Sequence, residues 1–169
     1  ICVREDHADK NREAVNTIVT IPLSGTGIET VLVEGADFYA SPRLSHSGKQ
    51  LCWISWMHPN MPWDNTRLSI ADVNQVGDLE NTKCIAGDEV DEAVCQPVWS
   101  PDDTLYFVTD RNNWWNLYRL SDSGVECVLE KEAEFAVPQW SFRECSYDFI
   151  DGDTVLAIYR QQGLAYLAR

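Results

Sequence analysis

The sequence lacks any apolar run close to the roughly 20 residues that a helix needs to cross a bilayer, and its opening, ICVREDHADK, lacks the long apolar segment of a signal peptide. Clusters of lysine and arginine are also missing, since 27 acidic residues against 13 basic ones give a formal charge of −14. Binding to nucleic acid requires such clusters to hold phosphates. The sequence therefore argues against a membrane partner and against a nucleic-acid partner, and we expect the scattered acids to form a solvated surface.

Cysteine pairs of the C-x-x-C kind and N-x-S/T glycosylation acceptors are absent. The six cysteines are widely and irregularly spaced, at Cys2, Cys52, Cys84, Cys95, Cys127 and Cys145. Zinc fingers need ligand pairs a few residues apart, so we predict no metal site and no cofactor. A chain of 169 residues with 44% apolar residues does not need disulfides to fold. We expect free, mostly buried thiols and a cytoplasmic location; an organelle is the alternative, because the chain begins without methionine and is interpreted as a fragment.

Three segments of the chain repeat one pattern. They are SPRLSHSGKQLCWISW from Ser41, QPVWSPDDTLYFVTDR from Gln96 and VPQWSFRECSYDFID from Val137. Each contains Pro-x-Leu/Trp-Ser, which predicts that Leu44, Trp99 and Trp140 are equivalent. The first two segments continue through a polar turn into a strand of alternating apolar residues. Internal repeats of this kind indicate a fold built from similar units.

The period of the repeat is typical of a β-propeller blade. Pro42, Pro97 and Pro138 are 55 and 41 residues apart, and a four-stranded blade takes about 40–50 residues. Apolar residues alternate with period 2, and no stretch of a dozen residues keeps a helical period. We therefore predict an all-β protein, a β-propeller fragment made of four-stranded antiparallel blades. A β-sandwich also has short strands at this spacing, but it has no reason to repeat one turn between its first two strands.

The predicted strands divide the chain into four units. Two near-complete blades cover 40–87 and 95–131, and partial blades cover 1–35 and 137–169. In the first unit, 14–23 and 29–35 are expected to be third and fourth strands, and in the last unit 163–169 is expected to be a third strand. An open arc of blades presents free sheet edges and an uncovered face. We therefore expect the isolated chain to associate with itself.

Residues 34–73 resemble a known family of enzymes. The run EGADFYASPRLSHSGKQLCWISWMHPNMPWDNTRLSIADV is similar to a propeller segment of the prolyl oligopeptidase family of serine peptidases, in its acylaminoacyl-peptidase and dipeptidyl-aminopeptidase branch. PVWSPDDTLYFVTDRNNWWNLYRL and EAEFAVPQWSF continue the resemblance in the right order, so that it extends from about Val15 to Tyr159. The combination of HPNMPWD with DRNNWWNLYRL is its most specific part.

This resemblance implies a larger enzyme, in which a propeller lies over a C-terminal α/β-hydrolase domain with a Ser-Asp-His triad and admits peptides to it. No serine of the 169 residues has the flanking glycines of a Gly-x-Ser-x-Gly elbow, and we interpret the hydrolase domain as absent from this sequence. No catalytic residue is assigned, and we expect the chain alone to have no peptidase activity. Its expected partners are a hydrolase domain of the same protein and a peptide substrate. A free-standing propeller scaffold that binds other proteins is the alternative.

Two loops contain the candidate contact residues. The first candidates are His58, Asn60, Met61, Trp63 and Asp64 in HPNMPWDN. This loop is interpreted either as a stiff loop directed at the channel or the hydrolase domain, or as a loop whose tryptophan packs on its own blade. The second candidates are Asp110, Arg111, Trp114 and Trp115 in DRNNWWN. They are interpreted as contacts at a hairpin tip, or as a hairpin with one tryptophan wedged between blades.

Two acidic segments, GDEVDEA (87–93) and EKEAEF (130–135), lie between successive predicted blades. One interpretation is an acidic gate, because a pair of carboxylates holds the amino terminus of a peptide through charge-assisted hydrogen bonds. The other is a pair of solvated turns, since most charged side chains are exposed. The segment DGD (151–153) is predicted to be a hairpin turn, because it lacks the further ligands of a calcium loop.

Overall fold

A computed structural model describes all 169 residues and contains fourteen β-strands, without a helix, in four antiparallel sheets. The first sheet contains β1 (Cys2–Asp6), β2 (Val15–Thr20) and β3 (Thr30–Val33), in that order. The second contains β4 (Phe38–Leu44), β5 (Gln50–Trp56), β6 (Arg67–Val73) and β7 (Leu79–Ala86). The third contains β8 (Val94–Trp99), β9 (Leu105–Thr109), β10 (Asn116–Ser121) and β11 (Gly124–Cys127). The fourth contains β12 (Tyr147–Asp151), β13 (Thr154–Gln161) and β14 (Leu164–Ala168).

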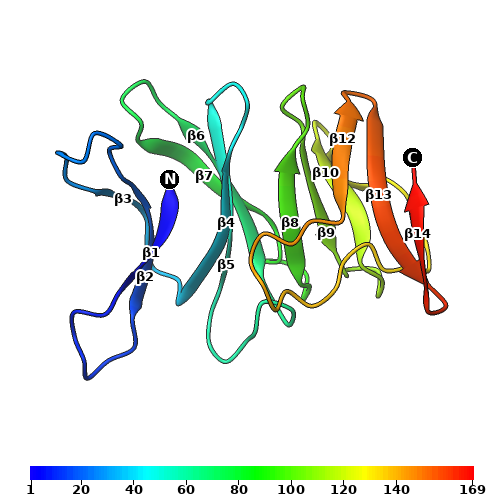
Figure 1. Ribbon diagram of the computed structural model, residues 1–169, viewed down its shortest axis with the longest axis horizontal. Coiled ribbons are helices and arrows are strands. Elements are labelled where there is room, and N and C mark those ends of the chain that lie inside the picture. The colour runs from blue at the N-terminus through cyan, green and yellow to red at the C-terminus, as the bar shows by residue number, and fades with distance from the viewer.

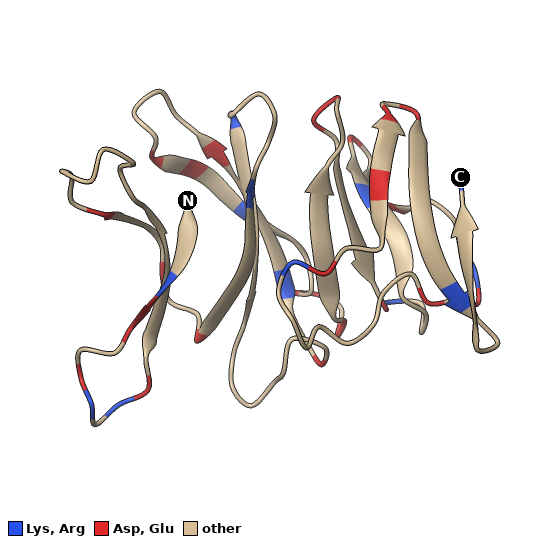
Figure 2. Ribbon diagram, in the orientation of Figure 1, with Lys and Arg blue, Asp and Glu red and all other residues tan.

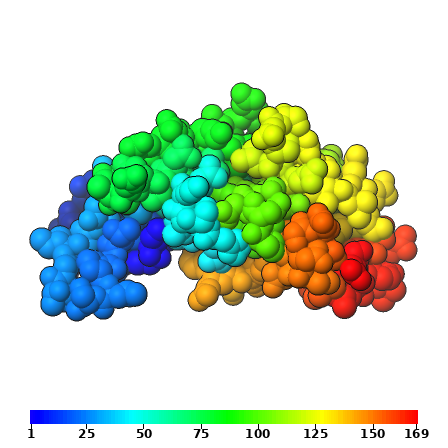
Figure 3. Space-filling view, turned by 90° about the horizontal axis from the view of Figure 1, so that it is seen from above, coloured from blue at the N-terminus to red at the C-terminus, as the bar shows by residue number.

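The four sheets stand side by side in chain order, with the two termini at opposite ends of the row (Figure 1). Seen from above, the row bends into an open arc whose hollow side lies between the N-terminal and C-terminal sheets (Figure 3). The predicted all-β propeller fragment, with two near-complete blades and a partial blade at each end, is confirmed. A membrane-crossing helix is not found in the structure.

Consecutive sheets pack face to face, because the residues of each strand alternate between two apolar clusters. Along β5, Leu51 and Trp53 belong to the cluster shared with the first sheet, whereas Cys52, Ile54 and Trp56 belong to the cluster shared with the third sheet. Side chains of a strand point alternately to opposite faces, so a strand between two sheets needs apolar residues at nearly every position. This explains the continuous apolar run QLCWISW.

Pro42 and Pro97 lie at a β-bulge in β4 and β8, which are the first and innermost strands of the second and third sheets. In both β4 and β8 the pairing with the next strand shifts register at this point. Ser41 and Gln96, each directly before the proline, have positive φ angles of 51° and 54°. Proline cannot donate to a β-ladder and is tolerated at bulges, so Pro42 and Pro97 occupy equivalent places, as predicted.

The predicted third copy of the repeat is wrong. Residues 137–140 belong to no strand, and Trp140 is 78% exposed whereas Trp99 is buried. Leu44 is also exposed, so the three positions are not equivalent in packing. The reason is that Pro-x-Trp-Ser is followed by FRECS, which contains neither the polar turn nor the alternating strand of the other two copies.

The inner strand of the fourth sheet is interrupted at this point. An isolated bridge joins Glu134 to Arg160, and regular pairing with β13 then resumes at Tyr147. Residues 136–146, which we call the inner-strand insert, leave the sheet between these two places. At the place where β4 and β8 have a bulge, the fourth sheet therefore has a longer segment that leaves the sheet and returns to it.

The six cysteines are free thiols, but the expectation that most are buried is wrong. Only Cys52 and Cys95 are buried, and the exposed ones are Cys84, Cys127 and Cys145. The exposed thiols lie on the outer strands β7 and β11 and in the inner-strand insert, where no neighbouring sheet covers them. Burial raises the pKa of Cys52 to about 12, which keeps this thiol protonated and unreactive near neutral pH.

Candidate functional site

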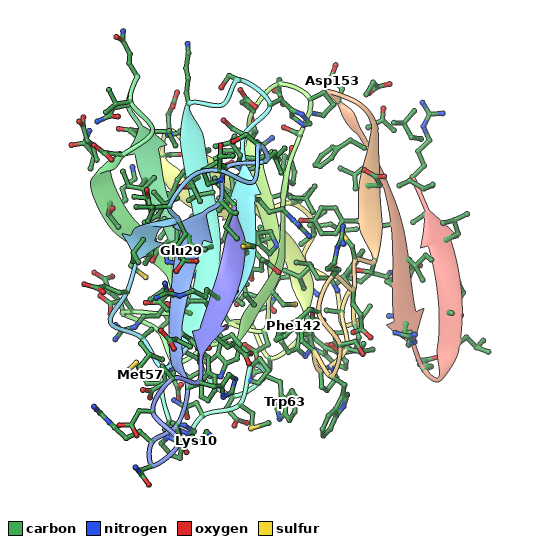
Figure 4. All side chains as sticks on the ribbon, turned by 60° about the vertical axis from the view of Figure 1, so that its left-hand side comes forward. Lys10, Glu29, Met57, Trp63, Phe142 and Asp153 are labelled. Atoms are coloured by element: carbon green, nitrogen blue, oxygen red, sulfur yellow. The ribbon has the colours of Figure 1, made fainter.

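The candidate residues gather at one end of the blades, the lower end in Figure 1. We call it the loop face; it is formed by the connections 7–14, 57–66, 87–93, 110–115 and 128–146. Because neighbouring strands are antiparallel, the link between the second and third strands of a blade emerges at the same end as the link to the next blade. Figure 4 places Lys10, Met57 and Trp63 toward this end, and Asp153 at the opposite one. Acidic residues lie at both ends of the sheets (Figure 2).

The loop 57–66 is anchored to the preceding blade through His58. The His58 backbone N–H donates to Asp37 Oδ2 at 2.8 Å. On the side chain, His58 Nε2 lies 2.9 Å from Glu13 Oε2, and the ring packs edge-on against Phe38 with centroids 4.7 Å apart. The peptide bond between His58 and Pro59 is cis. His58 is therefore a structural contact between the first two sheets at the loop face.

The other half of this loop reaches the inner-strand insert. The Trp63 ring lies 4.3 Å from the ring of Trp140, centroid to centroid, at an interplanar angle of 41°. Asp64 closes the turn by accepting the backbone N–H of Met61 at 2.8 Å. Asn60 donates its backbone N–H to the carbonyl of Met57 at 3.0 Å. A loop of the second sheet and a segment that leads into the fourth sheet thus meet at the loop face.

The contact between Trp63 and Trp140 is expected to contribute to the stability of the chain. Replacing either tryptophan by alanine should lower the free energy of unfolding, and replacing both should cost less than the sum, because either single change already removes the ring contact. The expected coupling is about 0.5–1.5 kcal/mol, the usual value for an aromatic pair. Urea unfolding of the four proteins, followed by circular dichroism, measures it. Strictly additive effects would contradict the contact.

Glu92 connects the loop 110–115 to the link between the second and third sheets. Its side chain is 0% exposed and accepts hydrogen bonds from Arg111 Nε at 2.8 Å, Arg111 Nη2 at 2.6 Å and the Gly87 N–H at 2.8 Å. The hydroxyl of Thr109 donates to the same carboxylate. Bonding to Glu92 raises the pKa of Arg111. For Glu92 the interpretation as a solvated turn is wrong, because its carboxylate is buried. The acidic gate does not fit Glu92 either, because the carboxylate is already bonded within the chain and is not free to hold a peptide.

The remaining candidates of the loop 110–115 also make structural contacts. Asp110 Oδ1 accepts the backbone N–H of Ala93 at 2.8 Å, and burial raises the pKa of this carboxyl. Trp115 donates its backbone N–H to Glu134 Oε2 at 3.0 Å and packs against the cluster between the third and fourth sheets. Trp115 therefore has the position expected of a tryptophan wedged between two blades. Trp114 is 36% exposed, so among the four candidates of this loop it has the side chain most accessible to a partner.

A hollow on the concave side of the arc involves residues that the sequence analysis did not single out. Its volume is about 570 Å³. The walls come from β1, β4, the ends of β2 and β5, and the insert; they are Ile1, Cys2, Val3, Glu5, Asn16, Phe38, Tyr39, Ala40, Ser41, Pro42, Arg43, Trp56, Phe142 and Arg143. One feature of the sequence could have pointed to the insert in this hollow. The polar turn is missing after Trp140, so this segment does not continue as a strand like the other two copies.

Comparisons with known proteins agree with the fold. No protein-family model matches the chain, and none of the curated proteins matches it. Puromycin hydrolase is 31% identical, with a TM-score of 0.82 over 91% of this chain and 24% of that protein. A puromycin-hydrolyzing peptidase of Mycobacterium tuberculosis is 32% identical, with a TM-score of 0.82 over 92% of this chain and 24% of that protein.

A more distant match shares the fold alone. TolB from Acinetobacter baumannii is 16% identical, with a TM-score of 0.52 over 90% of this chain and 37% of that protein. The chain spans about a quarter of the length of the two hydrolases that it matches. The matched region therefore comprises nearly all of this all-β chain and a minor part of each hydrolase.

Proposed function

We propose that this chain, which has the fold of the propeller portion of prolyl-oligopeptidase-family peptidases, controls the access of peptides to an α/β-hydrolase domain of the same protein and docks on that domain. The observation that carries the proposal is the TM-score of 0.82 to two hydrolases at 31% and 32% identity. Within the family we favour the acylaminoacyl-peptidase and dipeptidyl-aminopeptidase branch, because of the run HPNMPWD followed by DRNNWWNLYRL.

The shape of the chain supports a role in access. The inner-strand insert lies on the concave side of the arc, which is the side toward the axis of a propeller (Figure 3). Its side chains Trp140 and Phe142 are 78% and 67% exposed, and Met61 of the neighbouring loop is 46% exposed. Exposed apolar groups that lie close together are typical of binding surfaces. A peptide moving along the axis would pass these side chains.

We place the protein in the cytoplasm, and the cysteines support this choice. Cys84, Cys127 and Cys145 are exposed and unpaired. Free exposed thiols are typical of reducing compartments, because an oxidising environment favours disulfides.

An activity assay tests the proposed function. The complete protein encoded by the gene should hydrolyse an aminoacyl-anilide and lose this activity with a serine-directed inhibitor, whereas residues 1–169 alone should release no product. The reason is that no serine of this chain is flanked by the glycines of a nucleophile elbow. Inhibitor-sensitive hydrolysis by the chain alone, or a complete protein without a hydrolase domain, would contradict the proposal.

The alternative is a free-standing propeller that binds other proteins through its loop face. It is favoured by the exposed Trp114 and Trp140 on that face, since aromatic residues are enriched at protein interfaces. The two functions differ in the complete protein, because a scaffold has no hydrolytic activity in the assay above.

A further inference from the structure

The hollow on the concave side contains two arginines without an acidic partner. Arg43 and Arg143 both line it, and neither side chain takes part in a salt bridge or a hydrogen bond within the chain. Ion pairs hold four other arginines, which are Arg4, Arg67, Arg111 and Arg119. The remaining three, Arg12, Arg160 and Arg169, are also unpaired but do not line the hollow. In a chain with 27 acidic and 13 basic residues, two free guanidinium groups at one hollow indicate a site for an anion.

The two arginines come from different parts of the fold. Arg43 lies on β4, where it pairs with Cys52 of β5, and its carbonyl accepts the indole N–H of Trp99 at 2.9 Å. Arg143 lies in the insert, with a φ of 71°. Burial raises the pKa of Cys145, and the positive charge of Arg43 opposes this rise, which agrees with Arg43 lying near the insert. One guanidinium is therefore carried by the second sheet and the other by the inner-strand insert, and both line the same hollow.

Few negative charges compete for these guanidinium groups. Glu5 is the single carboxylate that lines the hollow, and its Oε2 lies 3.4 Å from His7 Nε2. Glu144 follows Arg143 but does not line the hollow. An incoming anion would therefore meet two cations and one carboxylate that already has a neighbouring partner.

Aromatic side chains form part of the walls of the hollow. Phe38 and Trp56 stack on each other with ring centroids 5.3 Å apart, and Phe142 of the insert is 67% exposed. Apolar walls with a few convergent charged groups are the usual composition of a ligand site, and about 570 Å³ is within the usual range of roughly 300–1,000 Å³. The ligand expected here has an apolar or aromatic body and a carboxylate.

We propose that this hollow binds the free C-terminal carboxylate of a peptide whose last residue is apolar or aromatic. The carboxylate lies between Arg43 and Arg143, since arginine bonds carboxylates in a bidentate manner. The last side chain packs against Phe38, Trp56 and Phe142. The proposal rests on the proposed function for the presence of peptides on the concave side, but the binding itself needs no hydrolase domain.

Calorimetric titration of residues 1–169 with N-acetyl-glycyl-phenylalanine and with its C-terminal amide tests the site. The free acid should bind about tenfold more tightly than the amide, equivalent to about 1.4 kcal/mol. R43Q and R143Q should each remove most of this preference. F142A should weaken the acid and the amide alike. The matched control is R12Q, because Arg12 also has no ion-pair partner and lies on the connection 7–14, outside this hollow.

Equal affinity for acid and amide, no binding of either, or an equal loss in R12Q would overturn the proposal. Thermal unfolding shows which variants are folded. If R43Q fails to fold, R143Q decides the test, because Arg143 is exposed and outside every strand and its replacement should leave the fold intact. The anilide assay separates this proposal from the proposed function. Hydrolysis by the complete protein without a preference for the acid refutes the carboxylate site alone, and a preference without hydrolysis refutes the peptidase alone.

Discussion

Replacing Glu92 by alanine is expected to lower the free energy of unfolding by about 3–5 kcal/mol, the usual cost of breaking a buried ion pair. The change leaves Arg111 without its bidentate partner and leaves the Gly87 N–H and the Thr109 hydroxyl without an acceptor. Domains of this size have about 5–15 kcal/mol in total, so much of the stability is lost. Urea unfolding followed by circular dichroism measures the difference.

A matched control is available in the same link between sheets. Asp88→Ala removes the partner of Arg67, but both side chains are more than half exposed, so the expected cost is about 0–1 kcal/mol. Replacing Glu92 by leucine together with Arg111 by methionine should cost less than Glu92→Ala alone, because no charge then remains buried and unpaired. A Glu92→Ala protein as stable as the Asp88→Ala protein would show that the buried pair is not formed.

The second large effect is expected from replacing Gly87 by alanine. A β-carbon at this position would lie 1.9 Å from the carbonyl oxygen of Thr66, so the link between the second and third sheets would have to move away from β6. The backbone φ of +86° adds the strain of a left-handed conformation. Together these should cost about 3 kcal/mol or more, which the same urea unfolding measures.

Gly77 is the control for this prediction, because it separates strain from crowding. Its φ of +94° is similar, but a β-carbon there would meet nothing within 4 Å. Gly77→Ala should therefore cost only the left-handed strain, about 1–2 kcal/mol. If the two substitutions had the same cost, the close approach of Gly87 to Thr66 would not be present in solution.

Both predictions concern the link 87–93, which joins the second sheet to the third. Thr66, directly before β6, donates its backbone N–H to the carbonyl of Glu92 at 3.1 Å. Its hydroxyl donates to the carbonyl of Val94 at 2.9 Å and accepts the N–H of Val94 at 2.6 Å. Asn116 bonds in the same way to the next link, through the carbonyls of Lys131 and Ala133. The second and third blades are thus each held to the next blade by a polar residue at, or directly before, the start of the third strand.

The candidate loops show what a sequence pattern does not contain. HPNMPWDN and DRNNWWN were recognisable as loops because proline, asparagine and aspartate favour turns. Their contacts were not predictable, since Trp63 reaches Trp140 and Arg111 reaches Glu92 across the gap between sheets. The same limit applies to the insert, because Arg43 and Arg143 are 100 residues apart in the sequence and line the same hollow only once the sheets pack.

The sequence by itself determined the strands, their alternation and the repeat that places Pro42 and Pro97 at equivalent positions, because these depend on local residue patterns and on a period of two residues. The same period places Trp53 and Trp56 on opposite faces of one strand, as the structure has them. Only the tertiary structure decided that Trp140 lies outside the repeat, that Glu92 is buried and paired, and that two arginines share a hollow. These three depend on which sheets lie next to each other, since burial and charge pairing come from neighbours that are distant in the chain.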